Sequence, residues 1–354
     1  MSFYGKWLEE KKEAQARAGD KVQAQAEGYQ RALGGTSKDN EHPAEGFDGS
    51  RTDQRAYPQG ATQYRTGNNN MPINNDIIMS YAVFKKNVLK HLEAFMPEGG
   101  KPGKYNGRGE YGHIVDIPGK SQREIIEAIL RSDGVETAAD FQKPQRYAHH
   151  LNSSQVVCYE FFRPLLVLKR GKLLVDDEKM QPVLRAMGVP ETPFLGAEAV
   201  FEKEFDDGEG TNFDFYLDSR DGKSHLYVEV KYTEQGFGTC EDNKSHRNKF
   251  RNIYLGQIAN SICLNDEAKR MKSSNDFPTM KKYYQLFRNT LRVKGENDFF
   301  VCLYPKENSI AESHFVDFRE KYVEPQMASH ILNVHWEDLE DSMNDRFRDK
   351  YFGY

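Results

Sequence analysis

The spacing of apolar residues divides the chain into three parts. The first part is strongly polar, because its aliphatic and Phe positions between residues 9 and 70, Ala aside, are only Val22, Leu33 and Phe47. So few apolar side chains cannot bury enough surface to offset the entropy lost on ordering. We therefore predict a flexible arm over residues 1–75, with an exposed helix over 7–32 and irregular chain after it. The alternative is a tail that binds a partner.

The second part, residues 76–150, is expected to be a helical extension. Its first helix is indicated by apolar residues three or four positions apart, namely Ile77, Tyr81, Phe84, Val88 and Leu92. A second helix is expected over residues 121–131. The segment 101–119 between them is rich in Gly and contains Lys101, Lys104 and Arg108. It forms either a surface connection or a loop that faces nucleic acid.

The third part, residues 151–354, has the densest apolar pattern. Asn152 or Ser153 can cap a helix that continues to Phe162, and Pro164 should kink or end it. Three strands, a helix and a further strand are then expected over residues 197–205, 212–217, 225–232, 251–264 and 298–304. This order predicts an α/β core.

Composition is consistent with a soluble protein that has a sizeable core, since 38% of the 354 residues are hydrophobic and 29% are charged. No stretch approaches the roughly 18 apolar residues that span a bilayer, and no run of signal-peptide type occurs. We therefore expect a cytoplasmic protein with no membrane partner.

The cysteines include no C-x-x-C pair, so we expect reduced thiols in or near the core. They are Cys158, Cys240, Cys263 and Cys302.

Two of the expected strands carry a candidate active site. Side chains alternate across a strand, which groups the apolar residues on one face: Phe213, Phe215, Leu217, Leu226, Val228 and Val230. Asp214, Glu229 and Lys231 are left on the other face. The dipeptide Asp221–Gly222 favours a two-residue type I′ turn, and the register that follows pairs Asp214 with Glu229.

Two opposed carboxylates favour a compensating cation, because like charges across a strand pair are destabilising. Mg²⁺, with Mn²⁺ as an alternative, prefers oxygen ligands and would activate a water for phosphodiester hydrolysis. Lys231 would orient that water or stabilise the transition state, and it is a poor base unless its pKa is depressed. The alternative is an ordinary hairpin whose polar face happens to hold these residues.

These residues resemble the PD-(D/E)XK nuclease superfamily, which has an Asp in its second core strand and Glu-x-Lys in its third. The matching residues are Asp214 and the run 229–231, although Phe213 replaces the usual Pro. Further segments resemble a bacterial restriction-endonuclease-like branch: 152–155, 201–202, 229–234, 303–305 and 336–339. The resemblance implies an α/β fold with a restriction-endonuclease-like core (αβββαβ). It also implies a metal-dependent nuclease, with a DNA endonuclease of restriction or defence type as the expected activity.

The superfamily often recruits another acidic residue from the first helix or strand. Glu160 and Glu202 are the candidates, and Glu202 is favoured by its place in the strand before Asp214. Gln257 on the following helix would touch the attacking water or the phosphate, or else is an ordinary solvated side chain. Asp214 and Glu229 are the expected metal ligands.

Charge is unevenly distributed, which matters because the net charge of -5 is unusual for a DNA-binding protein. Residues 243–294 contain twelve Lys or Arg and three acidic residues. Those nearest the candidate site, Lys244, Arg247, Lys249 and Arg251, are expected to bind DNA phosphates. Cutting both strands would suggest a homodimer. The alternative function is a non-catalytic DNA-binding or interaction protein on a nuclease-like fold.

Overall fold

The computed structural model describes residues 75–136, 141, 144–205 and 212–354. All of them belong to one compact unit, Gly67–Tyr354. The predictions made for the polar arm up to residue 74 lie outside the described residues. Among the helices that are described, none is long and apolar enough to cross a membrane.

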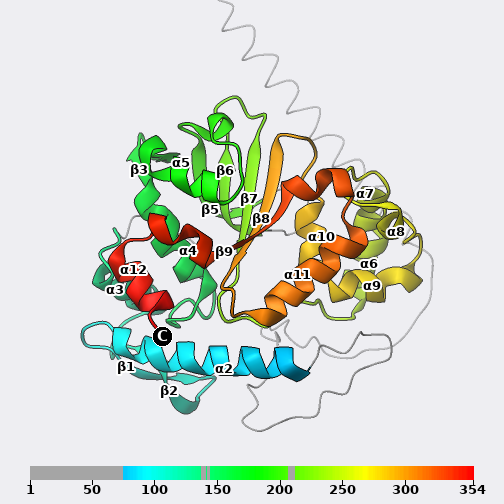
Figure 1. The fold of residues 1–354 in the computed structure, drawn as a ribbon. Coiled ribbons are helices and arrows are strands. Elements are labelled where there is room, and N and C mark those ends of the chain that lie inside the picture. Colours follow the sequence, from blue (N-terminus) through cyan, green and yellow to red (C-terminus); the bar gives the residue numbers. More distant parts are fainter. Residues whose placement is uncertain (1–74, 137–140, 142–143, 206–211) are drawn as a thin grey trace, which may run out of the picture. The chain divides into compact units, whose positions relative to one another are not determined.

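A seven-stranded mixed sheet forms the centre of this unit (Figure 1). Its strands follow one another in sequence order: β3 (Leu166–Lys169), β4 (Lys172–Val175), β5 (Glu198–Glu204), β6 (Asn212–Asp218), β7 (His225–Val230), β8 (Asp298–Tyr304) and β9 (Ile331–His335). Neighbours from β3 to β7 are antiparallel, whereas β7, β8 and β9 are parallel. The predicted α/β class is confirmed, and the sheet with its flanking helices is consistent with a restriction-endonuclease-like fold.

Helices cover both faces of the sheet. They are α2 (Asn75–Leu92), α3 (Gln122–Ser132), α4 (Ser154–Phe162), α5 (Asp177–Ala186), α6 (Lys244–Lys249), α7 (Leu255–Ala259), α8 (Asp266–Lys269), α9 (Phe277–Lys282), α10 (Tyr284–Thr290), α11 (Ser309–Tyr322) and α12 (Asp345–Phe352). The predicted helices at α2, α3 and α4 are confirmed. Ser121 begins α3 with a capping box that it shares with Glu124.

The core has two layers, one on each face of the sheet. One layer packs α2, α3, α4, α5 and α12 against alternate residues of the strands, including Phe215 and Val228. The other packs α7 to α11 against the intervening residues, including Tyr227 and Phe300. All four cysteines are free and buried, as predicted. The buried layers hold the central strands rigidly between them, which favours a site built on β5, β6 and β7.

Three predictions of the element pattern need correction. The segment 101–119 is no loose connection, because β1 (Lys101–Tyr105) and β2 (Arg108–Asp116) form an antiparallel hairpin in it. The extension therefore contains a hairpin as well as helices. A second hairpin, β3–β4, and helix α5 are inserted between α4 and β5. The helix expected over 251–264 is instead α6, a π-helical segment Phe250–Tyr254 and α7.

The β6–β7 turn differs from its prediction, although its register does not. The ladder pairs Phe215 with Val228, which is the predicted register. The chain turns between Ser219 and Ser224, whose backbone groups are hydrogen bonded at 3.0 Å. Gly222 has a positive φ of 65° but Asp221 does not, so no type I′ turn forms.

The prediction of the sheet face on which Phe213 lies is also wrong. Phe213 does not share a face with Phe215, because its ring packs against Tyr227 and Phe300 on the opposite side, at centroid distances of 4.9 and 6.1 Å. The regular pleat is interrupted beside it. Glu202 has a φ of 51°. The ladder between β5 and β6 pairs Phe201 with Phe215 and Lys203 with Phe213, but Glu202 and residue 214 between them are not paired.

Candidate active site

The candidate site begins where the ladder between β6 and β7 ends. Phe215 and Val228 are the last paired residues, and the same register places Asp214 opposite Glu229. The Asp214 side chain replaces the next backbone contact, because its Oδ2 accepts a hydrogen bond of 2.7 Å from the Val230 N–H. The two strands therefore part at Asp214, which leaves its second carboxylate oxygen available to other groups.

Glu229 is held in place by three side-chain donors. Lys231 Nζ lies 2.6 Å from Glu229 Oε1, and Gln285 Nε2 also donates to this oxygen. Asn289 Nδ2 donates to Oε2 at 3.0 Å. Glu229 is 3% exposed, so these contacts fix its carboxylate in a low-dielectric environment.

Gln285 and Asn289 were missed by the sequence reasoning. Both belong to α10 and are four residues apart, so they project from the same helical face. The residues between them include Leu286 and Phe287, which are buried in the core. Two amides one turn apart in a buried helix are the signal that would have identified them, because buried polar groups require partners.

Lys231 remains protonated in this site. Burial lowers its pKa, but the carboxylates of Glu229, Asp214 and Glu234 outweigh burial and raise the pKa above its ordinary value. Its backbone N–H continues the sheet by bonding the Leu303 carbonyl at 2.8 Å. Lys231 is therefore a rigidly placed cation and an unsuitable base.

The carboxyl groups of the site repel one another. Burial, then the charges of Glu229 and Glu202, raise the pKa of Asp214 well above its ordinary value. Burial likewise raises the pKa of Glu202 to about 7, against hydrogen bonds from Gln155, Asn212 and Gln145. Because the charge of one carboxylate raises the pKa of another, Asp214, Glu202 and Glu229 lie close enough to interact electrostatically.

Glu202 and Asp214 line the same cavity, which has a volume of about 410 Å³. Gln155 and Tyr159 of α4 form part of its wall. Glu202 accepts hydrogen bonds from Asn212 Nδ2 at 2.8 Å and from Gln145 Nε2 at 3.4 Å. Asp214 thus faces this cavity directly, whereas Glu229 is not among the residues that line it.

The other two candidate residues have different surroundings. Glu160 faces the C-terminal helix, where both its carboxylate oxygens contact Lys350 Nζ, at 2.9 and 3.2 Å. It is thus a structural ion pair and does not join Asp214. Gln257 lies half-buried on α7, whereas a different glutamine, Gln285, contacts Glu229.

A match to a family model bears on this geometry. Residues 90–352 match the family REase-ARP, described as restriction endonuclease associating with ARP. This range is more than half of the chain. The chain belongs to the REase-ARP family. A search of curated proteins finds no match, and a search of solved structures finds none either.

The REase-ARP match includes every element of the sheet and the whole candidate site. It also includes the hairpin β1–β2 and helix α12 at the C-terminus. The family therefore extends beyond the segment 151–340 that the sequence resemblance covers, into most of the N-terminal extension.

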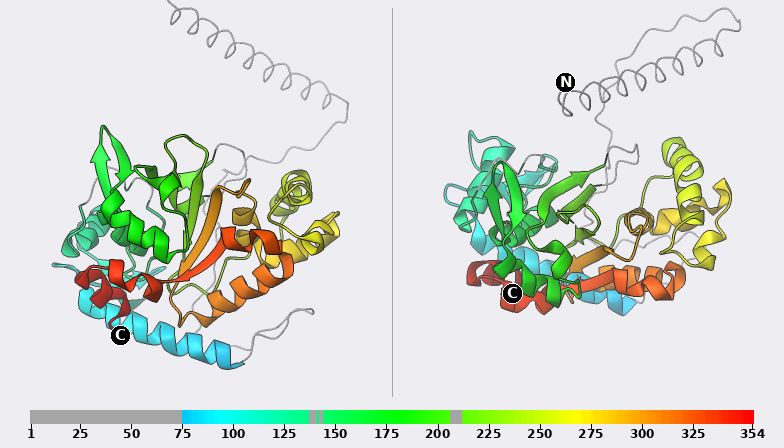
Figure 2. Two further views of the ribbon diagram at one scale, coloured as in Figure 1. Left: turned by 45° about the horizontal axis from the view of Figure 1, so that its top comes forward. Right: turned by 90° about the horizontal axis from the view of Figure 1, so that it is seen from above.

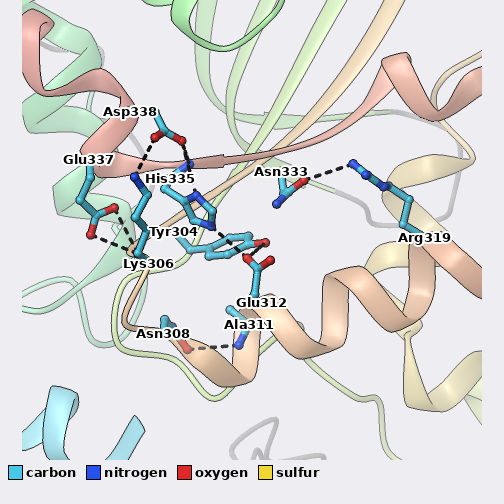
Figure 3. A network of polar contacts seen from close by, with 10 residues as sticks. All are labelled: Tyr304, Lys306, Asn308, Ala311, Glu312, Arg319, Asn333, His335, Glu337 and Asp338. Carbon is cyan, nitrogen blue, oxygen red and sulfur yellow. Dashed lines mark hydrogen bonds and ion pairs between the residues drawn. The ribbon is translucent and has the colours of Figure 1, made fainter. Parts of the chain in front are cut away.

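In this REase-ARP member, the chain that follows Lys231 is fixed by buried side chains. Asn308, which is fully buried, donates through Nδ2 to the carbonyls of Tyr232 and Glu234, each at 3.0 Å. Its Oδ1 accepts from Ala311 N–H and so caps α11 (Figure 3). Asn152 Nδ2 reaches Thr233 Oγ1 at 2.7 Å. The chain after β7 is thereby held to the segment just before α4 and to the start of α11.

A second polar network joins α11 to the ends of β8 and β9 (Figure 3). His335 at the end of β9 lies 2.9 Å from Glu312 Oε2 and 3.4 Å from Asp338. Tyr304 donates to the same Glu312 oxygen at 3.0 Å. The hydrogen bond with Glu312 raises the pKa of His335, so the network is held by an ion pair at mildly acidic pH. It ties β8, β9 and α11 together.

The predicted DNA-binding residues lie on one short helical stretch. Lys244, Arg247 and Lys249 belong to α6, and Arg251 follows in the π-helical segment. Arg247 forms an ion pair with Asp242 at 2.5 Å, whereas Lys244 and Arg251 are exposed. The stretch adjoins the site through α10, since the rings of His246 and Tyr284 are 5.6 Å apart. Tyr284 directly precedes Gln285.

Among the described residues, no group of three or more His, Cys, Asp or Glu side chains could hold a metal ion. The donors that converge here are the carboxylate oxygens of Asp214 and Glu229. Carboxylate oxygens are ligands that Mg²⁺ uses, one or two at a time, while it keeps several waters.

Proposed function

We propose that this REase-ARP protein is a divalent-metal-dependent nuclease that hydrolyses DNA phosphodiester bonds. Asp214 and Glu229 are the proposed ligands of Mg²⁺, which Mn²⁺ can replace, and Lys231 is the proposed catalytic cation. The observation that carries the proposal is the convergence of these three buried charged side chains where β6 and β7 part. Family membership supports the nuclease class.

The chemistry of the donor set fits a hard divalent cation. Asp214 is buried near two other carboxylates, and the resulting repulsion raises its pKa. A cation beside it would offset that repulsion and favour its ionised form. Its Oδ1 is not used by the contact that Oδ2 makes with Val230. Both features favour a cation at Asp214 over a purely structural role.

Each residue has a distinct task in the proposed reaction. When bound, Mg²⁺ supplies polarisation of a phosphate oxygen and a more acidic water. Lys231 stabilises the negative charge that develops on the phosphate oxygens, since it remains an ammonium group. Gln285 and Asn289 orient Glu229. Water oxygen bonds to phosphorus, the bond to the leaving oxygen breaks, the water proton passes to solvent, and the leaving oxygen is protonated from solvent.

The substrate is proposed to reach the site along α6. Exposed Lys244 and Arg251 on this stretch would bind backbone phosphates without regard to sequence. Because a single site cuts one strand at a time, cleavage of both strands would be the work of a homodimer. The family description names an association with ARP, and we include such a partner in the proposal.

Incubation with supercoiled plasmid tests the activity. With Mg²⁺ the wild-type chain should nick or linearise the plasmid, and without Mg²⁺ it should not. Asp214→Asn and Lys231→Ala should each reduce the rate by about 100-fold or more. Asp218→Asn, on the same strand but paired near the turn with His225, is the matched control and should cleave normally. Undiminished cleavage by both site variants would eliminate the site.

An interaction role without catalysis is the alternative. It predicts DNA or partner binding with no turnover at any metal concentration. The enclosed Glu229 with its three donors favours the enzyme, because a binding surface gains nothing from a buried carboxylate held next to a second one.

A further inference from the structure

The tip of the β1–β2 hairpin is rigidly built. Asn106 and Gly107 have φ values of 48° and 73°, so they form the two-residue turn that twisted hairpins prefer. Arg146 Nη2 donates to Asn106 Oδ1 at 3.0 Å. The rings of Tyr105 and Tyr147 stack at a centroid distance of 5.6 Å. The segment 145–147 thus braces the tip from the side.

This braced tip concentrates exposed positive charge. Lys104, Arg108 and Arg146 are exposed, and within the described part of the chain none of them has a carboxylate partner. Glu110 lies across the ladder from Lys104 but forms no ion pair with it there. Lys101, by contrast, pairs with Asp116 at 3.4 Å. Three neighbouring cations that form no ion pair with a described residue favour a polyanionic ligand.

A hollow beside the tip adds to this surface. Its volume is about 540 Å³, and Lys101, Lys104, Arg146 and His149 are among its lining residues. Burial lowers the pKa of His149, so this imidazole is neutral near pH 7. Glu110 and Asp116 also line the hollow. Asp116 is paired with Lys101, so the cationic lining residues without an ion pair among the residues that the structure describes are Lys104 and Arg146.

The tip is connected to the candidate active site through two adjacent residues. Gln145 contacts Glu202, which lines the same cavity as Asp214. Arg146 is the next residue, and it contacts the tip at Asn106. Arg146 is therefore adjacent in sequence to a residue, Gln145, whose hydrogen-bond partner Glu202 lines the cavity. Figure 2 shows this hairpin (teal) and the α6–α10 helices (yellow) on opposite sides of the central strands.

We propose that Lys104, Arg108 and Arg146 form a second DNA-backbone site, which holds the substrate duplex on the side of the active site opposite α6. The inference rests on the proposed function in one respect, namely that DNA is the substrate. Guanidinium and ammonium groups bind phosphate oxygens, and such contacts set the position of a duplex without reading its sequence. Two separated cationic elements would align one phosphodiester with Asp214.

The test is the salt dependence of DNA binding, measured by fluorescence anisotropy on a labelled duplex in EDTA. Lys104→Ala/Arg108→Ala should bind about tenfold more weakly, and its plot of log K against log salt should be less steep by about 2. Arg146→Ala should reduce the steepness by about 1. The matched control is Lys86→Ala/Lys90→Ala, two exposed lysines on the outer face of α2, which should bind like wild type.

The outcomes separate this inference from the proposed nuclease activity. Unchanged binding by both hairpin variants, while the wild-type chain cleaves plasmid, overturns the second site alone. Equal losses in hairpin and α2 variants also overturn it, because they indicate a general charge effect. Tighter binding of duplex RNA than duplex DNA would identify a different ligand and overturn it. If the wild-type chain neither binds nor cleaves DNA, the proposed function fails together with the inference. Unfolding midpoints of the variants should match wild type.

Discussion

Asp214 and Glu202 are the residues whose protonation is most altered by the fold. Both have raised pKa values, about 7 for Glu202 and well above the ordinary value for Asp214, first because they are buried. A carboxyl group with a raised pKa keeps its proton to higher pH. Because a divalent cation binds the ionised form, binding must release protons. Metal affinity should therefore increase as the pH rises through the neutral range.

This pH dependence can be measured by titrating Mn²⁺ into the metal-free chain. We expect the dissociation constant to be at least about tenfold smaller near pH 8 than near pH 6, with proton release on binding. Glu202→Gln should weaken the dependence, since it removes one of the repelling carboxylates. An affinity that is constant across this range would show that neither group titrates on binding.

At the scale of secondary-structure elements, α10 determines how Glu229 is presented. Gln285→Leu and Asn289→Leu should each lower the cleavage rate by about 10- to 100-fold and weaken Mn²⁺ binding, because ligand orientation depends on such partners. Asn275→Ala, at an exposed position shortly before α9, is the control and should leave both quantities unchanged. Loss of stability without loss of metal affinity would assign the two amides to packing alone.

The two hairpins show what sequence patterns can and cannot predict. The dipeptide Asp221–Gly222 led to the right register with the wrong turn, because the alternation of buried residues fixes register independently of the loop. The dipeptide Asn106–Gly107 is a genuine two-residue turn that went unrecognised amid the Gly-rich sequence. Period-two patterns were also missed in β3, a four-residue edge strand with exposed Val167 and Leu168.

The partners of the site could not be predicted in the same way. Asp214, Glu229 and Lys231 come from adjacent strands, so local pairing brings them together. Gln285 and Asn289 lie 56 and 60 positions after Glu229. Their contact with it depends on how α10 packs onto the sheet, and no pattern within a short window encodes that docking. The same holds for Glu160, whose partner Lys350 is 190 residues away.

At the scale of the whole unit, α12 closes the layer that contains α4. Lys350 is fully buried between Glu160 and Asp133. Lys350→Met should lower the free energy of unfolding by about 3–5 kcal/mol, since it leaves the buried Glu160 carboxylate without its cation. Asp133, by contrast, keeps its ion pair with Arg346. Urea denaturation measures this, and Lys321→Met is the control. Lys321 forms a partly exposed pair with Asp317, so its loss should cost less than about 1 kcal/mol.

The central claim is that Asp214 and Glu229 share one divalent cation. It is tested most directly by calorimetric titration of Mn²⁺ into the full chain and into Asp214→Asn, Glu229→Gln and the control Asp218→Asn. We predict one binding event for wild type and the control, weakened at least about tenfold in each site variant. Equal Mn²⁺ affinity in all four proteins would contradict the account.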